Sequence, residues 1–291
     1  MKESGILMPV SALPSRTGIG ELGAQTREFL KLLRENKVTI WQILPLNPVG
    51  YGNSPYQPYS SFAGDPVYIS LDELYEEGLL LERPPALRQN ARTVDYEGVR
   101  SWKEEYLRSA FLKFSSNADA EQKDAGYQEF EKQKWVQNYG VFQAFRKKNG
   151  GLCWNEWTEE ERNWPENQYP LSDELEEEAR YQIFVKRTAN DLGIRIMGDV
   201  PFYVGLDSAD VWAGKDNFLL DTDGRPVFIA GVPPDYFSKT GQRWGNPIYD
   251  WEKLQKDDYK FWVERIGCSN QMFDLVRIDH FRAFDTFWKI P

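Results

Sequence analysis

The segment Leu275-Val276-Arg277-Ile278-Asp279-His280-Phe281-Arg282 is an apolar run that ends in a cluster of charged residues. Side chains two positions apart on a strand share a face, so Arg277 and Asp279 are expected to point the same way. A guanidinium group beside a carboxylate keeps that carboxylate ionised, which a carboxylate nucleophile requires. His280, the only histidine of the chain, comes next. The alternative interpretation is that Asp279 caps the following helix and pairs with Arg282.

Near-continuous apolar runs predict four buried strands, at Ile6–Val10, Thr39–Leu44, Ile194–Val200 and Leu275–Ile278. Such runs are typical of parallel strands that are covered on both faces. Helical periodicity precedes three of them, in Phe29, Leu30 and Leu33 before Asn36, in Leu175, Ala179, Ile183 and Phe184 after an N-cap at Ser172 or Asp173, and in Tyr259, Trp262 and Ile266. The pattern predicts an α/β fold made of β/α units.

Each strand run is followed by residues that could do chemistry. These are Ser11 to Ser15 after the first, Asn47 and Pro48 after the second, Asp199 and Tyr203 at the end of the third, and Asp279 and His280 after the fourth. In (β/α)8 barrels the active site lies at the carboxyl ends of the strands. We therefore expect these residues to converge, although any polar loop would place some there.

The region between the second and third strands, from Gly50 to about residue 169, reads as a mainly helical insertion. One helix is predicted through Val99, Trp102, Tyr106 and Phe111, and a second through Phe130, Trp135, Phe142 and Phe145, ending at Gly150-Gly151. After the third strand, a hairpin is predicted with strands 218–221 and 226–229 and a turn at Asp223-Gly224.

Composition excludes several classes of protein. The formal charge of −10 argues against a nucleic-acid partner, because binding phosphates needs a basic surface. No apolar run is long enough to cross a membrane, and the first residues lack the features of a signal peptide. Cys153 and Cys268 have neither metal-ligand nor disulfide spacing. A cytoplasmic protein without a metal site or cofactor is expected.

Gly18-Ile19-Gly20-Glu21-Leu22-Gly23 matches the G-x-G-x-x-G pattern of dinucleotide-binding proteins. Two features oppose that interpretation. Four residues, Pro14 to Thr17, separate the strand from the glycines, and the second strand ends in Leu44-Pro45-Leu46-Asn47 with no acidic residue to hold a ribose hydroxyl. A turn that leads into a helix is the better explanation, and a dinucleotide-dependent oxidoreductase remains a remote alternative.

Two loops have the composition of a sugar-binding surface. The 11 Trp, 15 Tyr and 17 Phe residues supply many flat rings of the kind that stack on sugars, although core packing accounts for most of them. Residues 53–62 combine prolines with Tyr and Ser, and residues 233–247 form a glycine-hinged, aromatic segment that could act as a lid. Ordinary surface loops are the alternative for both.

At these residues the chain resembles the 4-α-glucanotransferases, also called amylomaltases or disproportionating enzymes, of the α-amylase-like clan. The resemblance is carried by residues 5–15, 42–48, 54–60, 198–204, 233–247 and 277–282, and it covers essentially the whole chain. The end of the fifth segment, Gly241-Gln242-Arg243-Trp244-Gly245-Asn246-Pro247, is the most specific of these motifs. Ala283 departs from the family, which usually has glycine after Phe-Arg.

The resemblance implies a retaining transfer of α-1,4-glucan segments between maltooligosaccharides. Asp279 matches the nucleophile, and Arg277 matches the residue that orients it. The remaining matches are to substrate-binding positions, namely Ser54, Tyr56, Asp199, Trp244, Asn246 and His280. The implied partners are α-1,4-glucans, and no cofactor is implied.

Length is the larger departure. Retaining chemistry needs a second carboxyl group roughly 5–5.5 Å from the nucleophile, and in the family this acid/base and a further donor-site Asp follow later strands. The resemblance therefore implies a (β/α)8 barrel of which the chain holds only about the first four units. The expected divisions are residues 1–50 for the first units, 51–170 for the helical insertion with a substrate loop, and 171–291 for units three and four with the lid 233–247.

The chain by itself is therefore expected to be inactive. A glucan-binding fragment or an α-glucan hydrolase are the alternatives to transfer. Strands at Ile194–Val200 and Leu275–Ile278 are expected to have unpaired edges, which favour self-association or aggregation.

Overall fold

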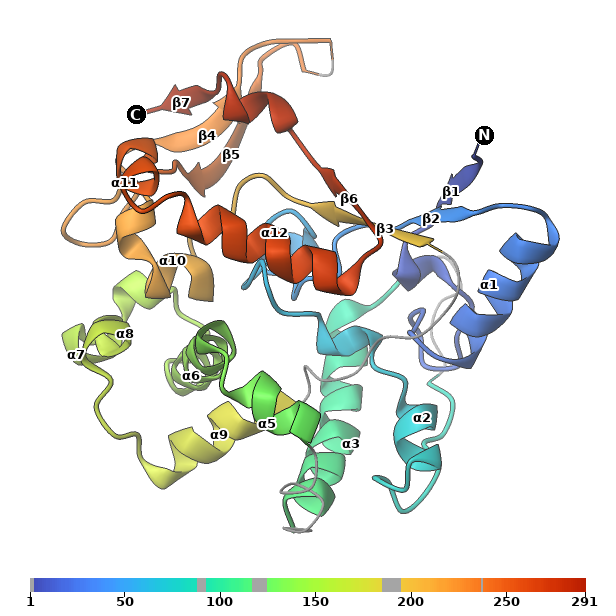
Figure 1. Ribbon diagram of the computed structural model, residues 1–291. Helices are drawn as coiled ribbons and strands as arrows, with labels where there is room; N and C mark the ends of the chain where they lie inside the picture. The colour runs from blue at the N-terminus through green and yellow to red at the C-terminus, as the bar shows by residue number, and fades with distance from the viewer. Residues whose placement is uncertain (1–2, 88–92, 117–124, 185–194, 237) are drawn as a thin grey trace.

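A computed structural model describes residues 3–87, 93–116, 125–184, 195–236 and 238–291. Its centre is a parallel sheet of four strands, which are β1 (Gly5–Leu7), β2 (Ile40–Gln42), β3 (Arg195–Val200) and β6 (Leu275–Ile278) (Figure 1). Their spatial order is β1-β2-β3-β6, and each strand pairs in parallel with the next. The predicted α/β fold with a parallel sheet is confirmed.

β1 and β2 end before the apolar runs that predicted them, whereas β6 has the predicted bounds Leu275–Ile278. The first run was expected to reach Val10, but β1 ends at Leu7 and a 3-10 turn, η1 (Val10–Ala12), follows Pro9. Proline has no N–H to donate to a ladder, so it ends the pairing there. Ile194 lies outside the described residues. β3 has partners on both sides, so the prediction of an unpaired edge on that strand is wrong, and the edges are β1 and β6.

Two of the predicted helices connect these strands. α1 (Ala24–Glu35) buries Leu30 and Leu33, ends at Asn36 as expected, and leads to β2. α12 (Lys260–Met272) precedes β6 and buries Trp262, while Tyr259 lies just before the helix in a left-handed conformation. These amphipathic faces account for the periodicity in the sequence.

The insertion between β2 and β3 is mainly helical, as predicted, and occupies the lower half of Figure 1. Its helices are α2 (Leu71–Glu76), α3 (Tyr96–Ser116), α5 (Ala125–Glu131), α6 (Lys134–Lys148), α7 (Glu159–Arg162), α8 (Trp164–Asn167) and α9 (Asp173–Phe184), with 3-10 turns η2 (Tyr51–Asn53), η3 (Pro66–Tyr68) and η4 (Trp154–Glu156). α9 begins at Asp173, so Ser172 is at its N-cap position, and it packs against α6 and α3.

The single helix predicted through Phe130 and Phe145 is wrong, because the structure has two, α5 and α6. Gln133 has an extended conformation between them and starts α6. The break allows the Trp135 ring to stack on Phe62 at a centroid distance of 5.7 Å. Phe130 meets the same Trp135 ring edge-on at 5.6 Å. Tertiary packing of aromatic rings thus overrides the local helical pattern.

Most of the tryptophans belong to the core, as expected from composition. Trp212 is fully buried, and its ring stacks on Trp164 at a centroid distance of 6.0 Å. Around this pair lie Phe142, Phe145 and Trp157 from the helical insertion. The insertion and the chain after β3 therefore share one hydrophobic core.

A second, antiparallel sheet follows β3. It consists of β4 (Ile229–Val232), β5 (Gln242–Pro247) and β7 (Trp288–Ile290), in the order β5-β4-β7. Between β3 and β6 lie also α10 (Ala209–Ala213), η5 (Lys215–Asn217) and α11 (Trp251–Lys256), and η6 (Phe281–Phe284) follows β6.

Two loop predictions change as a result. The tight turn at Asp223-Gly224 is present, with the Gly224 N–H donating to the Asp221 carbonyl at 3.0 Å, but its flanks make only an isolated bridge between Leu220 and Pro226. The segment 233–247 is not a loop throughout, because its second half is β5. β5 is hydrogen-bonded to β4 as an antiparallel strand. The pattern of glycines and aromatic residues did not indicate this strand.

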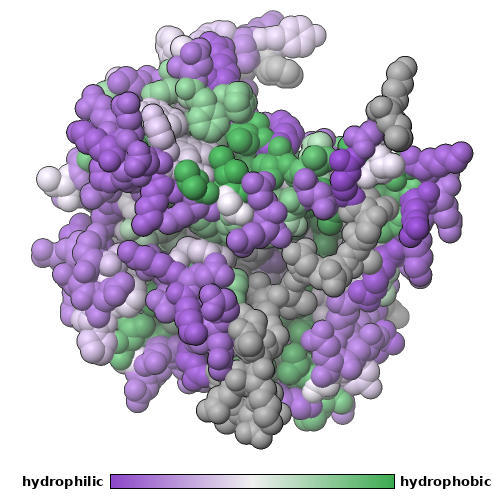
Figure 2. Space-filling view, viewed as in Figure 1, coloured by the Kyte–Doolittle hydropathy of each residue, from purple (hydrophilic) through white to green (hydrophobic). Residues whose placement is uncertain are grey.

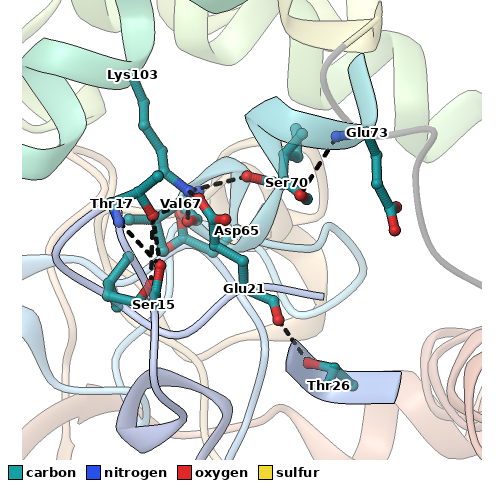
Figure 3. A network of polar contacts seen from close by, with 11 residues as sticks. Ser15, Thr17, Glu21, Thr26, Asp65, Val67, Ser70, Glu73 and Lys103 are labelled. Atoms are coloured by element: carbon teal, nitrogen blue, oxygen red, sulfur yellow. Dashed lines mark hydrogen bonds and ion pairs between the residues drawn. The ribbon is translucent and has the colours of Figure 1, made fainter. Parts of the chain in front are cut away.

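The glycines of the G-x-G-x-x-G segment serve close packing. A Cβ atom on Gly20 would lie 1.8 Å from the Val10 carbonyl oxygen, and one on Gly23 would lie 2.7 Å from Ser70 Oγ. Between them, the buried Glu21 accepts from Thr17 at 2.6 Å and pairs with Lys103 of α3 at 2.5 Å (Figure 3). The space beside these glycines is thus filled by the chain itself, which explains the motif without a dinucleotide.

No helix within the described part of the chain is both long and apolar enough to span a membrane.

Candidate functional site

The candidate site is centred on Arg277, which lies between two carboxylates. In the β3–β6 ladder Arg277 is directly opposite Asp199, and Asp279 is two residues further along the same strand direction. The guanidinium donates to Asp199 Oδ1 at 2.5 Å from one terminal nitrogen and to Asp279 Oδ1 at 2.5 Å from the other. Arg277 and Asp279 thus lie on the same face of the strand, as their spacing of two predicted. The parallel register places Asp199 of β3 beside them.

The backbone of Asp279 is still bonded to β3, and the chain leaves the sheet at the next residue. The Asp279 N–H donates to the Val200 carbonyl at 2.9 Å, and His280 then takes a left-handed conformation with φ of 52°, which turns the chain into η6. The N-cap position of η6 is His280, and no side chain caps it. Arg282 contacts Thr286. The interpretation of Asp279 as a helix cap paired with Arg282 is therefore wrong.

Tyr56 completes the polar cluster from the loop after β2. Its hydroxyl donates to Asp199 Oδ2 at 2.8 Å, so both oxygens of this buried carboxylate have a donor. Burial raises the pKa of Asp199, while the Tyr56 hydrogen bond and the Arg277 charge oppose that rise. Burial, together with Asp199, raises the pKa of Tyr56 to about 12, so the phenol remains a donor.

Arg277 keeps its charge in this setting. Partial burial works against the cation, but Asp199 and Asp279 outweigh it, and the net effect is a raised pKa of the guanidinium. A permanently protonated arginine between two carboxylates supplies a fixed positive field at the carboxyl ends of β3 and β6.

Aromatic rings form one side of the site. Trp244 meets His280 edge-on at 5.0 Å, and Tyr203 lies 6.2 Å from the Trp244 ring and 6.3 Å from His280. Burial lowers the pKa of His280, although Asp279 opposes the shift, so the imidazole is neutral at neutral pH. Flat rings beside carboxylates provide both the stacking and the polar contacts that a sugar needs.

Two of the expected site residues make hydrogen bonds to the backbone of the chain. Asn246 is buried, and its side-chain amide donates to the Val204 carbonyl at 2.9 Å. Ser54 Oγ accepts from the Tyr56 N–H at 3.4 Å, so it shapes the loop that presents Tyr56. The structure therefore brings Tyr56, Asp199, Trp244, Arg277, Asp279 and His280 together and places Ser54 and Asn246 in supporting contacts.

Two residues near the site were missed by sequence reasoning. Gln57 donates from its side-chain amide to the Trp244 carbonyl at 2.8 Å. Arg265 of α12 is fully buried and donates to the carbonyls of Pro201 and Phe202, just after the strand that carries Asp199. A signal existed for Arg265, because it lies three residues after Trp262 on the apolar face of the helix.

A cavity of about 600 Å³ lies elsewhere and shares none of these residues. Side chains of both charge signs line it, among them Glu159, Lys215, Asp221 and Lys253. Since Trp154 in its wall is only 1% exposed, the cavity offers no open ring face for a sugar. The Asp199–Arg277–Asp279 cluster remains the better candidate.

A parallel β/α sheet with carboxylates and an arginine at its carboxyl edge, flanked by aromatic rings, is an arrangement typical of carbohydrate-active α/β proteins. Residues 8–291 match the family model described as 4-alpha-glucanotransferase, and the chain belongs to this family.

Relatives and solved structures agree with this assignment. The chain is 42% identical to the 4-alpha-glucanotransferase of Thermus thermophilus and 42% identical to that of a Synechocystis strain, covering 99% of this chain and 60% of each relative. The amylomaltase from Streptococcus agalactiae, solved in complex with acarbose, superposes with a TM-score of 0.88 at 35% identity, covering 100% of this chain and 61% of that one. The chain thus spans about 60% of the length of the relatives it matches.

The amylomaltase from Corynebacterium glutamicum supports the fold alone. It is 17% identical, with a TM-score of 0.74 over 99% of this chain and 42% of that one.

Proposed function

We propose that these residues form the donor-side half of an enzyme that transfers α-1,4-glucan segments between maltooligosaccharides. The observation that carries the proposal is the cluster in which Arg277 joins Asp199 to Asp279 beside Tyr56. In the protein of full length, a (β/α)8 barrel is expected, with the first units in residues 1–50, a helical insertion in 51–170 and units three and four in 171–291. Its cytoplasmic location stays a prediction.

In this proposal Asp279 is the nucleophile. One of its oxygens forms a bond to the anomeric carbon of the donor sugar as the bond from that carbon to the departing glucan oxygen breaks. A carboxylic acid in the remaining part of the protein gives its proton to that oxygen. The 4-hydroxyl of an acceptor glucan then attacks the anomeric carbon and gives its proton to the carboxylate that was left when that acid lost its proton. The ester to Asp279 breaks at the same time, and two inversions retain the configuration.

The difference in burial supports the division of roles between the carboxylates. The Asp199 side chain is 1% exposed, whereas that of Asp279 is 36% exposed. A nucleophile must reach the sugar, so Asp279 suits that role, and Asp199 suits the role of a fixed partner for Arg277 and Tyr56. Arg277 orients Asp279 through the hydrogen bond between them.

The binding surface has the chemistry of an α-glucan site. Tyr56 supplies a ring from the loop after β2 and Trp244 supplies one from β5, with His280 beside Trp244. The Streptococcus agalactiae amylomaltase was solved with acarbose, which supports an α-glucan as the ligand at the matching surface of this chain.

The test of transfer uses the 291 residues extended by the C-terminal part of the Thermus thermophilus relative, incubated with maltotriose. Glucose together with oligomers longer than maltotriose is the expected result. Accumulation of glucose and maltose without longer products would instead identify a hydrolase.

The matched variant is Asp279→Asn, which is nearly isosteric and removes the nucleophilic oxygen. We expect transfer to fall by several orders of magnitude, roughly the loss seen when a nucleophile is removed, while the melting temperature changes little. Near-normal transfer by this variant would exclude Asp279 as the nucleophile. Isothermal titration of acarbose into the 291-residue chain separately tests glucan binding without turnover.

A further inference from the structure

Trp244 lies in an interruption of the β4–β5 ladder. The paired residues are Gly231 with Arg243 and Ile229 with Pro247, so a single residue of β4, Ala230, faces three residues of β5. These three are Trp244, Gly245 and Asn246, and Gly245 has a φ of 82°. Bulges of this kind bend a strand and re-aim a side chain, and here the bend directs Trp244 toward His280.

Residues in such a bulge lose regular ladder partners, and here two side-chain amides hold it, one from within the bulge and one from the loop after β2. Asn246 donates to the Val204 carbonyl at 2.9 Å, which ties the bulge to the chain after β3. Gln57 donates to the Trp244 carbonyl at 2.8 Å, which ties the bulge to the loop after β2. The bulge is thus held from two sides.

Gln57 is itself rigidly placed. Its N–H donates to the Ser54 carbonyl at 3.2 Å, and its carbonyl accepts from the Gly50 N–H at 3.1 Å. A Cβ atom on Gly50 would lie 2.6 Å from that carbonyl oxygen, so the loop closes tightly around Gln57. The preceding residue is Tyr56, whose hydroxyl reaches Asp199.

We propose that Gln57 is a positioning residue that sets the distance between the Tyr56 and Trp244 rings by holding the backbone of the bulge. This inference rests on the proposed function, because the two rings matter only if a glucan lies between them. Gln57 acts through the Trp244 carbonyl. A single hydrogen bond therefore couples the loop after β2 to the strand on the other side of the site.

The first test measures the affinity of the full 291-residue chain for acarbose by isothermal titration calorimetry. Gln57→Leu is expected to weaken binding about fivefold, the effect of one lost hydrogen bond, and Gln57→Glu to weaken it similarly because it keeps the shape without the donor. Gln255→Leu makes the same chemical change on the exposed part of α11 and is expected to bind like the wild type.

A double-mutant cycle separates positioning from general destabilisation. Trp244→Ala removes the ring, so adding Gln57→Leu to it should produce no further loss of acarbose affinity. Fully additive losses, or wild-type affinity of Gln57→Leu, would overturn the proposal.

The second test needs no ligand. The indole ¹⁵N–¹H resonance of Trp244 is assigned by its disappearance in Trp244→Phe, and Gln57→Leu is expected to shift or broaden it while Gln255→Leu leaves it in place. An unchanged Trp244 resonance in Gln57→Leu would contradict the positioning role. Failure of the wild-type chain to bind acarbose would instead count against glucan binding by this chain, and the resonance would still decide the role of Gln57.

Discussion

Arg277 contacts two carboxylates that differ in access to solvent. Asp199 is enclosed by β3, β6 and the Tyr56 loop, and both of its oxygens accept hydrogen bonds. Asp279 has the same guanidinium on one side and an open approach on the other. The pair therefore combines one carboxylate fixed in place with one that can reach a substrate, and the arginine stabilises both.

At this scale, Tyr56→Phe should raise the pKa of Asp199 further. The phenol stabilises the ionised carboxylate, so its loss leaves burial less opposed. The pH titration of the Asp199 carboxyl carbon, followed by NMR, is the measurement, and Tyr75→Phe on the partly exposed face of α2 is the control. A lower or unchanged pKa in Tyr56→Phe would show that the hydrogen bond does not act on Asp199.

Ala283 also belongs to the residue scale. It is buried in η6, and its N–H donates to the His280 carbonyl at 2.9 Å. The methyl group of Ala283 is accommodated without a left-handed backbone, because Ala283 is not among the described residues with positive φ.

Among the elements, α3 is anchored through Lys103. This buried ammonium donates to the carbonyls of Val67 at 2.6 Å and Ile69 at 2.8 Å, and it pairs with Glu21 (Figure 3). Its three donors thus join α3 to η3 and to the turn before α1. Through Glu21, the contact also ties the glycine-rich segment to α3.

Lys103→Met should therefore reduce the free energy of unfolding by about 3–5 kcal/mol, because Glu21 would remain buried without a cation. Urea denaturation measures the change. Lys113→Met, an exposed position of the same helix, should stay within about 0.5 kcal/mol of the wild type. Adding Glu21→Gln to Lys103→Met should restore part of the loss, and no recovery would contradict the explanation.

α10 carries a second buried charge, Asp210, which accepts from the Ser61 N–H at 2.7 Å and from Ser61 Oγ at 3.1 Å. Burial raises the pKa of Asp210 to about 6, although Arg265 and Ser61 oppose the rise. In an unfolded chain the pKa is about 3.9. At pH values between these two pKa values, Asp210 is protonated in the folded state and ionised in the unfolded state.

The contribution of Asp210 to stability should consequently be complete below pH 4 and decline as the pH rises toward 6, by on the order of 3 kcal/mol. Asp210→Asn should lack this decline. Free energies of unfolding measured for both proteins between pH 4 and 7 give the comparison, and parallel curves for the two would exclude the raised pKa.

At the scale of the whole molecule, the central sheet ends in two open edges. The residues of β1 are exposed, with Ile6 at 40% and Leu7 at 54%, and Phe281 after β6 is 66% exposed. Figure 2 shows hydrophobic side chains gathered in the upper middle of the viewed face, around the C-terminal segment. Open edges and apolar patches of this kind favour pairing with another chain.

We therefore expect the 291-residue chain to associate with itself as its concentration rises, which static light scattering after size-exclusion chromatography detects. Leu7→Lys should shift the chain toward monomer, because a charge on an edge strand opposes pairing. Leu81→Lys changes an even more exposed leucine, at 84%, that lies outside the sheet and should have no such effect. A wild-type monomer at all concentrations would contradict the prediction.

The sequence alone determined the features that depend on local periodicity. The parallel strands follow from near-continuous apolar runs, and α1 and α12 follow from a repeat of about 3.6 residues. The shared face of Arg277 and Asp279 follows from the two-residue period of a strand. The motif around Trp244 likewise identified residues that meet in the site.

Only the tertiary structure decided how distant segments meet. The register that sets Asp199 against Arg277, the break between α5 and α6, the burial of Asn246 and the contact of Gln57 with Trp244 all join residues from different elements. No local pattern specifies such pairings, because each depends on which strands become neighbours and on which rings and amides then compete for the same space.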